Sequence, residues 1–134
     1  MAYPPDFFTV TMDTWILVID DDPGTREALS DILRRAGYLV SAWADDEPLR
    51  TSTLEHAYQV AVVDYHLPHL NGLEVARRLK QFQPDCRIVL ISSELPHLPE
   101  LAHQGAAVDR FLAKPFSKDA ILEVIAQFCF SRAE

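Results

Sequence analysis

The sequence predicts an α/β fold in which helices cover both faces of a parallel sheet. Short apolar runs alternate with segments of helical periodicity, giving five strand-then-helix units in about 120 residues. The apolar runs are continuous, which is typical of strands buried on both faces. Parallel strands need crossover connections, and right-handed crossovers place helices on either side of the sheet.

Each expected strand is a short apolar stretch bounded by charged or turn-forming residues. The first is the run WILVI, which ends directly before three aspartates. The others are rich in valine, isoleucine and aromatic residues, as strands generally are. The expected strands span Trp15–Ile19, Tyr38–Ala42, Val60–Val63, Arg87–Ile91 and Phe111–Leu112.

Helices are expected between these strands and after the last one. The first begins near Pro23 or Gly24 and ends at Gly37, because proline suits the first helical position and glycine the position after the last. Its apolar face carries Leu29, Ile32, Leu33 and Ala36. A weak helix is expected around Glu47–Glu55.

The later helices differ in how clearly the sequence marks them. Asn71-Gly72 opens one helix, with Leu73, Ala76 and Leu79 on one face, and the last helix is marked by Ile121, Val124, Ile125 and Phe128. Between them, Pro96 and Pro99 allow only a short or irregular fourth helix that begins near Pro99.

The chain is expected to form one domain over residues 14–131, preceded by an irregular arm at residues 1–13. The formal net charge of -8 repels phosphate backbones and anionic lipid, so nucleic acid is not expected as a direct partner. No run reaches the ~18 apolar residues of a membrane span. Cys86 and Cys129 are too few for a disulfide framework and are expected as reduced thiols in a cytoplasmic protein.

Polar residues follow four of the expected strands. Asp20-Asp21-Asp22 follows the first strand, Asp64 the third, Ser92-Ser93 the fourth and Lys114-Pro115 the fifth. Ligands of open parallel sheets bind at the carboxyl ends of the strands, so these side chains are expected to converge.

The residue types suit phosphoryl transfer. Mg²⁺ prefers a few carboxylate oxygens, and Asp20, Asp21 and Asp64 are candidates to supply them. Asp64 stands alone at the end of its strand, which makes it the expected nucleophile. The Lys114 ammonium and the Ser92 hydroxyl are expected to bind phosphoryl oxygens.

Each of these residues also has a purely structural interpretation. Asp22-Pro23-Gly24 is typical of a helix N-cap followed by a first-position proline, and Asp22 is expected to be only that cap. Asp64 could be a turn residue and Lys114 a surface lysine. Four histidines have no spacing that suggests a zinc site, and they are expected on the solvated surface. Two tryptophans are expected to be packing residues. These are His56, His69, His97 and His103, with Trp15 and Trp43.

From Trp15 to about Phe130 the chain resembles the receiver domains of response regulators. The segment ILVIDDDP at 16–23 resembles the family's acidic pocket, VVDYHLP at 62–68 its phosphoacceptor loop, and KPF at 114–116 its lysine motif. The resemblance implies a flavodoxin-like (βα)5 fold with strand order 2-1-3-4-5.

The resemblance also implies roles for single residues. Asp20, Asp21, Asp64 and the backbone carbonyl of His66 would hold Mg²⁺, and the peptide before Pro115 could be cis. Ser92 and Phe111 stand at the family's switch positions, where phosphorylation draws in the hydroxyl and the ring follows.

The function implied is that of a signalling module which phosphorylates and dephosphorylates itself. A histidine kinase or histidine phosphotransfer protein would donate the phosphoryl group, and a downstream protein would respond to the surface of the fourth helix, fifth strand and fifth helix. The spacings between Ser92, Gly105 and Lys114 depart from the family pattern on this surface. The standard dimer is therefore not expected, and the oligomeric state is left open.

Other functions were weighed against this one. A receiver fold could act as an interaction module without phosphorylation, although the intact aspartate and lysine set argues against it. A phosphatase of the haloacid-dehalogenase kind would use Asp20 as nucleophile, but the chain is short for a cap domain and Pro23 interrupts the motif. A flavin-binding protein would not place three aspartates where a phosphate binds.

Overall fold

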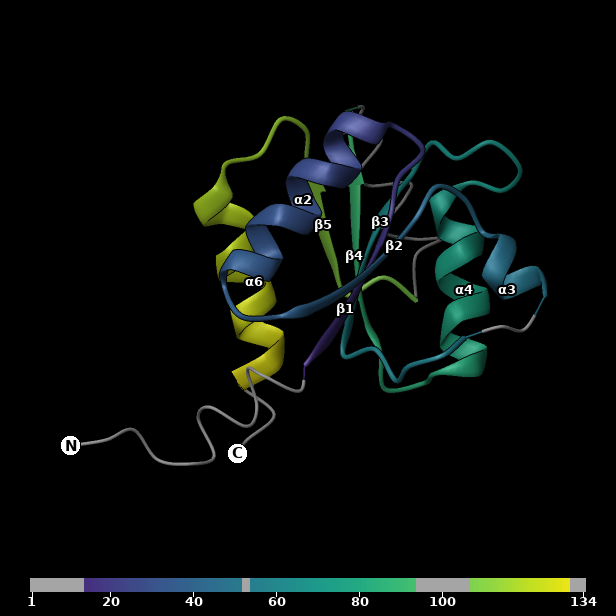
Figure 1. Cartoon of the computed structure of the whole chain (residues 1–134). Coiled ribbons are helices and arrows are strands. Elements are labelled where there is room, and N and C mark those ends of the chain that lie inside the picture. Colours follow the sequence, from purple (N-terminus) through teal and green to yellow (C-terminus); the bar gives the residue numbers. More distant parts are fainter. Residues whose placement is uncertain (1–13, 52–53, 94–106, 131–134) are drawn as a thin grey trace.

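Five parallel strands form one sheet, with helices between them along the chain (Figure 1). The computed structural model describes residues 14–51, 54–93 and 107–130. The strand order is β2-β1-β3-β4-β5, so the expected α/β fold and its order are confirmed. The elements are β1 (Trp15–Ile19), α2 (Pro23–Arg35), β2 (Leu39–Trp43), α3 (Glu47–Arg50), β3 (Val60–Asp64), α4 (Gly72–Phe82), β4 (Arg87–Ser92), β5 (Arg110–Ala113) and α6 (Lys118–Phe130).

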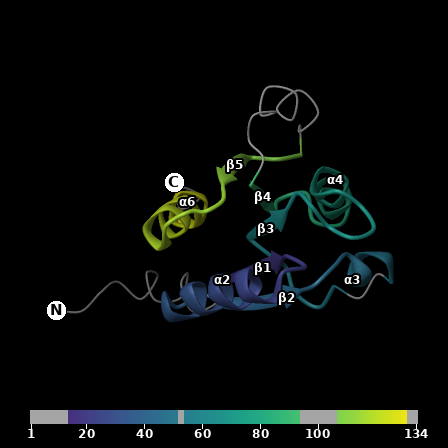
Figure 2. The same cartoon turned by 90° about the horizontal axis from the view of Figure 1, so that it is seen from above.

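The helices divide between the two faces of the sheet. Seen from above, α2 and α6 lie on one side and α3 and α4 on the other (Figure 2). Because successive strand residues point to opposite faces, β1 contributes Ile16 and Val18 to one apolar cluster and Leu17 and Ile19 to the other. Burial on both faces therefore explains the continuous apolar run of β1 that the sequence shows.

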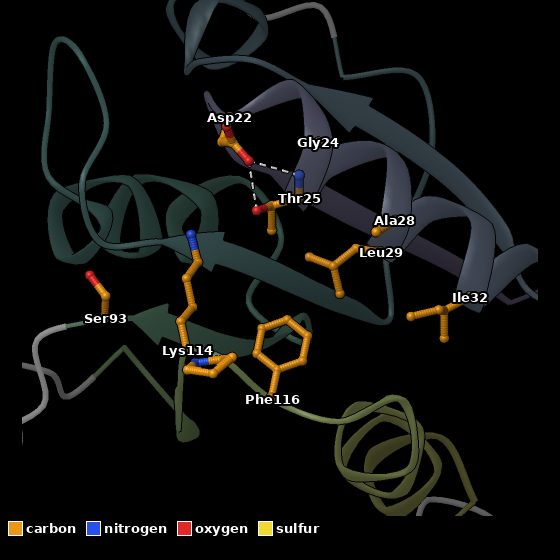
Figure 3. Close-up of a pocket in the computed structure, with 10 residues that line it drawn as sticks. Asp22, Gly24, Thr25, Ala28, Leu29, Ile32, Ser93, Lys114 and Phe116 are labelled. Atoms are coloured by element: carbon orange, nitrogen blue, oxygen red, sulfur yellow. Dashed lines mark hydrogen bonds between the residues drawn. The ribbon is translucent and has the colours of Figure 1, made fainter.

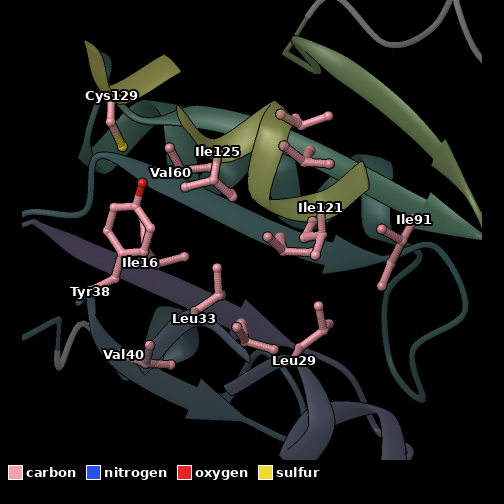
Figure 4. Packing of buried hydrophobic residues seen from close by; sticks show 14 residues of the cluster. Ile16, Leu29, Leu33, Tyr38, Val40, Val60, Ile91, Ile121, Ile125 and Cys129 are labelled. Carbon is pink, nitrogen blue, oxygen red and sulfur yellow. The ribbon is translucent and has the colours of Figure 1, made fainter. Parts of the chain in front are cut away.

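The cluster between the sheet, α2 and α6 is one of the two parts of the core (Figure 4). Leu29 and Leu33 of α2 and Ile121 and Ile125 of α6 are at most 1% exposed. At one end of this cluster the Tyr38 hydroxyl hydrogen-bonds with Cys129, and burial, followed by the influence of Cys129, raises the pKa of Tyr38 to about 12. Cys86 and Cys129 are both buried free thiols, as expected.

Helix α2 begins and ends where the sequence predicts. The Asp22 carboxylate accepts hydrogen bonds from the backbone N–H and the hydroxyl of Thr25, both at 2.8 Å, which confirms Asp22 as the N-cap. Gly37 follows the helix with a φ of 102°, in the left-handed region that favours glycine. The cap at Asp22 and the turn at Gly37 thus mark the two ends of the helix that adjoins the acidic loop.

Two expected elements need correction. The second strand runs one residue later than expected, over Leu39–Trp43, and the weak helix stops at Arg50 instead of continuing to Glu55. Further along, the Gln83 side chain fixes the segment that follows α3, because its Oε1 accepts the Tyr58 N–H at 2.8 Å and its Nε2 donates to the His56 carbonyl at 2.7 Å. These two hydrogen bonds hold the chain in a non-helical conformation before β3.

One aromatic residue near these hydrogen bonds also differs from expectation. His56 stacks on Trp15, with ring centroids 3.6 Å apart, so it is a packing residue and not a freely solvated one. Trp15 and Trp43 pack against the core as predicted, and His69 is exposed. The short fourth helix near Pro99, the arm at 1–13, His97 and His103 lie outside the described residues.

Among the helices of the described ranges, none has both the length and the apolar composition needed to cross a bilayer. The exposed large apolar side chains in the same ranges are Leu39, at 38% exposure, and Phe82, at 49%. They belong to different elements, β2 and α4.

Helix α4 begins in direct contact with the segment that follows β3. Asn71 caps the helix by accepting the Glu74 N–H at 3.0 Å, and the Gly72 N–H donates to the Tyr65 carbonyl at 2.8 Å. A Cβ added at Gly72 would lie 2.5 Å from the Asp64 carbonyl oxygen and 2.8 Å from the Tyr65 Cα. Only glycine therefore fits at the start of this helix without moving the backbone beside Asp64.

Gly72→Ala is expected to lower the free energy of unfolding by about 1–3 kcal/mol, because the added methyl group overlaps backbone atoms that cannot turn away. Urea unfolding followed by circular dichroism measures the change. Gly24→Ala is the matched control, since its Cβ would meet only the Asp22 carboxylate at 3.5 Å, an ordinary contact. Equal stability of the two variants would contradict the close packing at Gly72.

Candidate functional site

The carboxyl ends of β1 and β3 lie side by side and bring the predicted acidic residues together. The two strands are hydrogen-bonded neighbours, and Ile19 is paired with Val63. The next residues, Asp20 and Asp64, therefore stand next to each other at the same edge of the sheet. This edge is also where the strand order reverses, between β1 and β3.

Asp20, Asp21 and Asp64 form a compact carboxylate cluster. One oxygen from each side chain can be chosen so that all three lie within 4.8 Å of one another. Asp20 and Asp64 are buried, at 0% and 5% exposure, whereas Asp21 is exposed. Hard oxygen donors with one open side are what a hexacoordinate divalent cation needs, because it keeps several waters or ligand oxygens. The residues present fit such an ion.

Lys114 joins the cluster from the end of β5. Its Nζ lies 3.1 Å from Asp20 Oδ2 and 3.5 Å from Asp64 Oδ2. Burial alone would lower the pKa of Lys114, but its hydrogen bond and charge interaction with Asp20, and those with Asp64, raise it above the ordinary value. The ammonium therefore stays charged and offsets part of the repulsion between the two buried carboxylates.

The backbone holds Lys114 in place. Its N–H donates to the Ser92 carbonyl at 2.8 Å, which continues the pairing of β5 with β4. The Lys114–Pro115 peptide is cis, as the sequence resemblance implied. Ser92 is 1% exposed at the end of β4, so the expected phosphoryl-binding hydroxyl lies at the same edge as the carboxylates.

The environment of Asp64 disfavours its charge. Burial and the nearby Asp20 carboxylate raise the pKa of Asp64, while Lys114 and the His66 N–H, 3.3 Å from Asp64 Oδ1, act in the opposite direction. The chain after Asp64 is fixed by the Tyr65 N–H, which donates to the Ile91 carbonyl at 2.9 Å. The position of Asp64 is thus fixed by the backbone, and Lys114 and the His66 N–H only partly stabilise the negative charge of its carboxylate.

Two contacts of the acidic loop were not anticipated from the sequence. Asp20 Oδ1 accepts the Asp22 N–H at 2.9 Å, so Asp22 supports the cluster through its backbone besides capping α2. The Arg26 guanidinium donates to the Asp20 carbonyl oxygen at 2.8 Å. A charged residue on the exposed part of an amphipathic helix gives no sequence signal of such a contact.

The match to a family model decides which family the chain belongs to. The model described as "Response regulator receiver domain" matches residues 16–126, which is most of the chain. The chain belongs to the response regulator receiver domain family. The family resemblance found in the sequence motifs is therefore confirmed.

Individual relatives of this receiver domain are longer proteins or solved receiver structures. The chain is 37% identical over 114 residues to the C4-dicarboxylate transport transcriptional regulatory protein DctD of Pseudomonas aeruginosa, covering 84% of this chain but 24% of DctD. The chain thus spans about a quarter of that relative's length.

Two solved structures share the fold. Response regulator TrrA of Thermotoga maritima, in complex with Mg(2+)-BeF, has a TM-score of 0.75 and 27% identity over 86% of this chain and 98% of that one. A Burkholderia pseudomallei response regulator with a phosphorylated aspartic acid, a calcium ion and citrate has a TM-score of 0.72 and 30% identity over 90% of this chain and 72% of that one.

Beside the cluster, this receiver domain has an open, mainly apolar cavity of about 540 Å³. Lys114 and Phe116 form one side, and the first turns of α2, with Leu29 and Ile32, form the other (Figure 3). Lys114 is common to the cavity and the carboxylate cluster. The sequence reasoning did not anticipate the cavity, because its walls come from segments about 90 residues apart.

The remaining predicted residues lie around the cluster and not within it. His66 is exposed on the segment after β3, and its backbone approaches Asp64. Phe111 is half-buried in the middle of β5, paired with Leu90, and packs against the core cluster on the α4 side. It is separated from the carboxylates by the width of β4.

Asp64→Asn is expected to raise the melting temperature of the metal-free protein by a few degrees at neutral pH. The raised pKa of Asp64 means that its ionised form is less favourable in the folded state than in the unfolded chain. Such a group stabilises the fold fully below its unfolded pKa, and that contribution is lost as the pH rises through the folded pKa. The gain is therefore expected to be small below about pH 4 and to grow above it.

Calorimetric melts in EDTA across the acid-to-neutral range measure this difference. Asp31→Asn is the matched control, because the Asp31 carboxylate is 62% exposed and pairs with Arg35 at 3.1 Å, so its loss brings no gain. A lower melting temperature for Asp64→Asn at every pH would show that the attraction to Lys114 outweighs burial and repulsion.

Proposed function

We propose that this receiver domain accepts a phosphoryl group on Asp64 from a histidine kinase or a histidine phosphotransfer protein, in a reaction that needs Mg²⁺. The observation that supports it is the Asp64 carboxylate at the end of the central strand, clustered with Asp20 and Asp21 and with Lys114 Nζ 3.5 Å away. The same combination of carboxylates and ammonium is what phosphoryl transfer uses to neutralise the charge of the transferred group.

Side chains of Asp20, Asp21 and Asp64, with the backbone carbonyl of His66, would hold the cation. When bound, Mg²⁺ supplies positive charge that stabilises the anionic oxygens of the transferred group. The exposed position of Asp21 leaves an open side where those oxygens can approach. In its absence the carboxylates repel one another, and Lys114 is the cation that partly offsets this.

The proposed chemistry is a single in-line displacement. An Asp64 carboxylate oxygen attacks phosphorus, the bond from phosphorus to the donor's imidazole nitrogen breaks, and that nitrogen keeps the electron pair. Lys114 would turn from the carboxylates to a phosphoryl oxygen, and Ser92 would donate its hydroxyl to another. Water later attacks phosphorus, the bond from phosphorus to the Asp64 oxygen breaks, and inorganic phosphate leaves while Asp64 returns to its carboxylate form.

The switch is proposed to run from Ser92 to Phe111. Both residues belong to the β4–β5 pair, and the Ser92 carbonyl binds the Lys114 N–H, so a movement of Ser92 acts on the strand that carries Phe111. Phe111 is only half-buried, so part of its ring lies at the surface that the switch would change. A downstream protein would recognise the altered surface near β5 and α6.

The bounds of the domain and its location in the cell are also proposed. Residues 14–131 would be the receiver unit, with residues 1–13 as an arm, because the family match starts and ends close to these bounds. The free buried thiols of Cys86 and Cys129 are consistent with a reducing cytoplasm.

The geometry is less favourable to Asp20 as the nucleophile, the alternative raised by the phosphatase motif. Asp20 is fully buried, and its two carboxylate oxygens are engaged by the Asp22 N–H and by Lys114. Asp64 lies at the central strand and is slightly more accessible. The proposal therefore assigns attack to Asp64 and metal binding to Asp20.

Incubation with acetyl phosphate and Mg²⁺ is expected to add one phosphoryl group, detected as an increase in intact mass. EDTA or Asp64→Asn should abolish the adduct. Lys114→Ala should slow its formation on the order of 10²–10³-fold, because a preorganised charge in the transition state is lost. Lys118→Ala, which removes an exposed lysine at the start of α6, is the matched control and should react normally.

Two results would contradict the proposal. An adduct that persists in Asp64→Asn and maps to Asp20 would support phosphatase-like chemistry. No adduct in the wild type, even with cold incubation and rapid quenching, would leave a receiver fold that binds its partner without phosphorylation.

A further inference from the structure

The acidic loop is held from outside the carboxylate cluster by a residue of helix α2. Arg26 Nη1 donates to the Asp20 carbonyl oxygen at 2.8 Å, across the turn that joins β1 to α2. Arg26 is half-buried, and its own carbonyl accepts the Ser30 hydroxyl at 2.7 Å. A side chain of the helix therefore fastens the loop that precedes the same helix.

Asp20 has a partner for every one of its polar groups. Its N–H donates to the Trp43 carbonyl at 3.1 Å, Oδ1 accepts the Asp22 N–H, and Oδ2 accepts from Lys114. Arg26 completes the set at the carbonyl oxygen. Because Asp20 is fully buried, loss of any partner leaves a polar atom unsatisfied unless the loop moves.

We propose that Arg26 is a positioning residue for the cation site, holding the Asp20–Asp22 turn so that the Asp20 and Asp21 carboxylates face Asp64. This inference rests on the proposed function, because it concerns the Mg²⁺ site assigned there. Arg26 contacts none of the reacting groups directly. It acts through the backbone of Asp20.

The charge of Arg26 allows its positioning effect to be separated from its electrostatic effect. The guanidinium charge reaches the acidic loop: hydrogen bonds from Thr25 are the main cause of the lowered pKa of Asp22, and Arg26 adds to them. By charge alone, a guanidinium near the site repels a divalent cation, so its removal would strengthen Mg²⁺ binding. A positioning role predicts the opposite sign.

The test is titration of Arg26→Gln with MgCl₂, followed by NMR of the backbone amides of residues 20–22 and 64–66. Mg²⁺ binding is expected to weaken about tenfold, because a charged hydrogen bond to a buried carbonyl is lost. Arg34→Gln is the matched control. Arg34 lies on the same helix and donates to the Val40 carbonyl at 3.3 Å, so the charge change is identical but the acidic loop is untouched.

Arg26→Lys keeps the charge but not the planar donor group, and Mg²⁺ binding is expected to weaken several-fold in it as well. Unchanged or tighter Mg²⁺ binding in Arg26→Gln overturns the inference. If that variant does not fold, wild-type affinity in Arg26→Lys overturns it. If the wild type itself shows no Mg²⁺-dependent shifts, the proposed cation site fails, and the positioning role fails with it.

Discussion

The structure of the site depends on the ion pairs that two buried carboxylates form with one ammonium group. Asp20 and Asp64 follow adjacent strands, and Lys114 reaches both from two strands beyond β3. This contact spans the sheet from β1 to β5 and is possible only when four strands are in register. The geometry of the site thus depends directly on correct pairing of the sheet.

The surrounding structure offsets the cost of burying these charges. The apolar side chains at 16–19 of β1 and 60–63 of β3, which precede the two buried carboxylates, are 0% exposed between the two helical layers. Such packing stabilises a domain by far more than one poorly compensated carboxylate destabilises it. The sheet can therefore hold Asp64 in an environment that raises its pKa, and a carboxylate held in that way is stabilised strongly by a nearby cation.

Sequence reasoning recovered the parts of the molecule that local patterns encode. Periodicity placed the strands and α2, α4 and α6, and the turn residues Asp22 and Asn71 marked helix starts correctly. The polar strand ends predicted the carboxylate cluster, because parallel topology brings such ends together. The path of the chain between α3 and β3 could not be predicted, since the hydrogen bonds that hold it join Gln83 to residues about 25 positions earlier. Arg26 escaped notice because its partner is a backbone atom, which any residue type supplies.

The absence of a side chain at Gly72 restricts how this protein can diverge. The first turn of α4 rests directly on the peptide that carries Asp64, with no replaceable side chain between the two backbones. Substitution at Gly72 cannot gradually change the distance between α4 and the backbone at Asp64. Across a contact between two side chains, substitution could do so. A change in the geometry of the loop after Asp64 must therefore come from insertions, deletions or substitutions within residues 65–71, where His66, Pro68 and His69 are exposed.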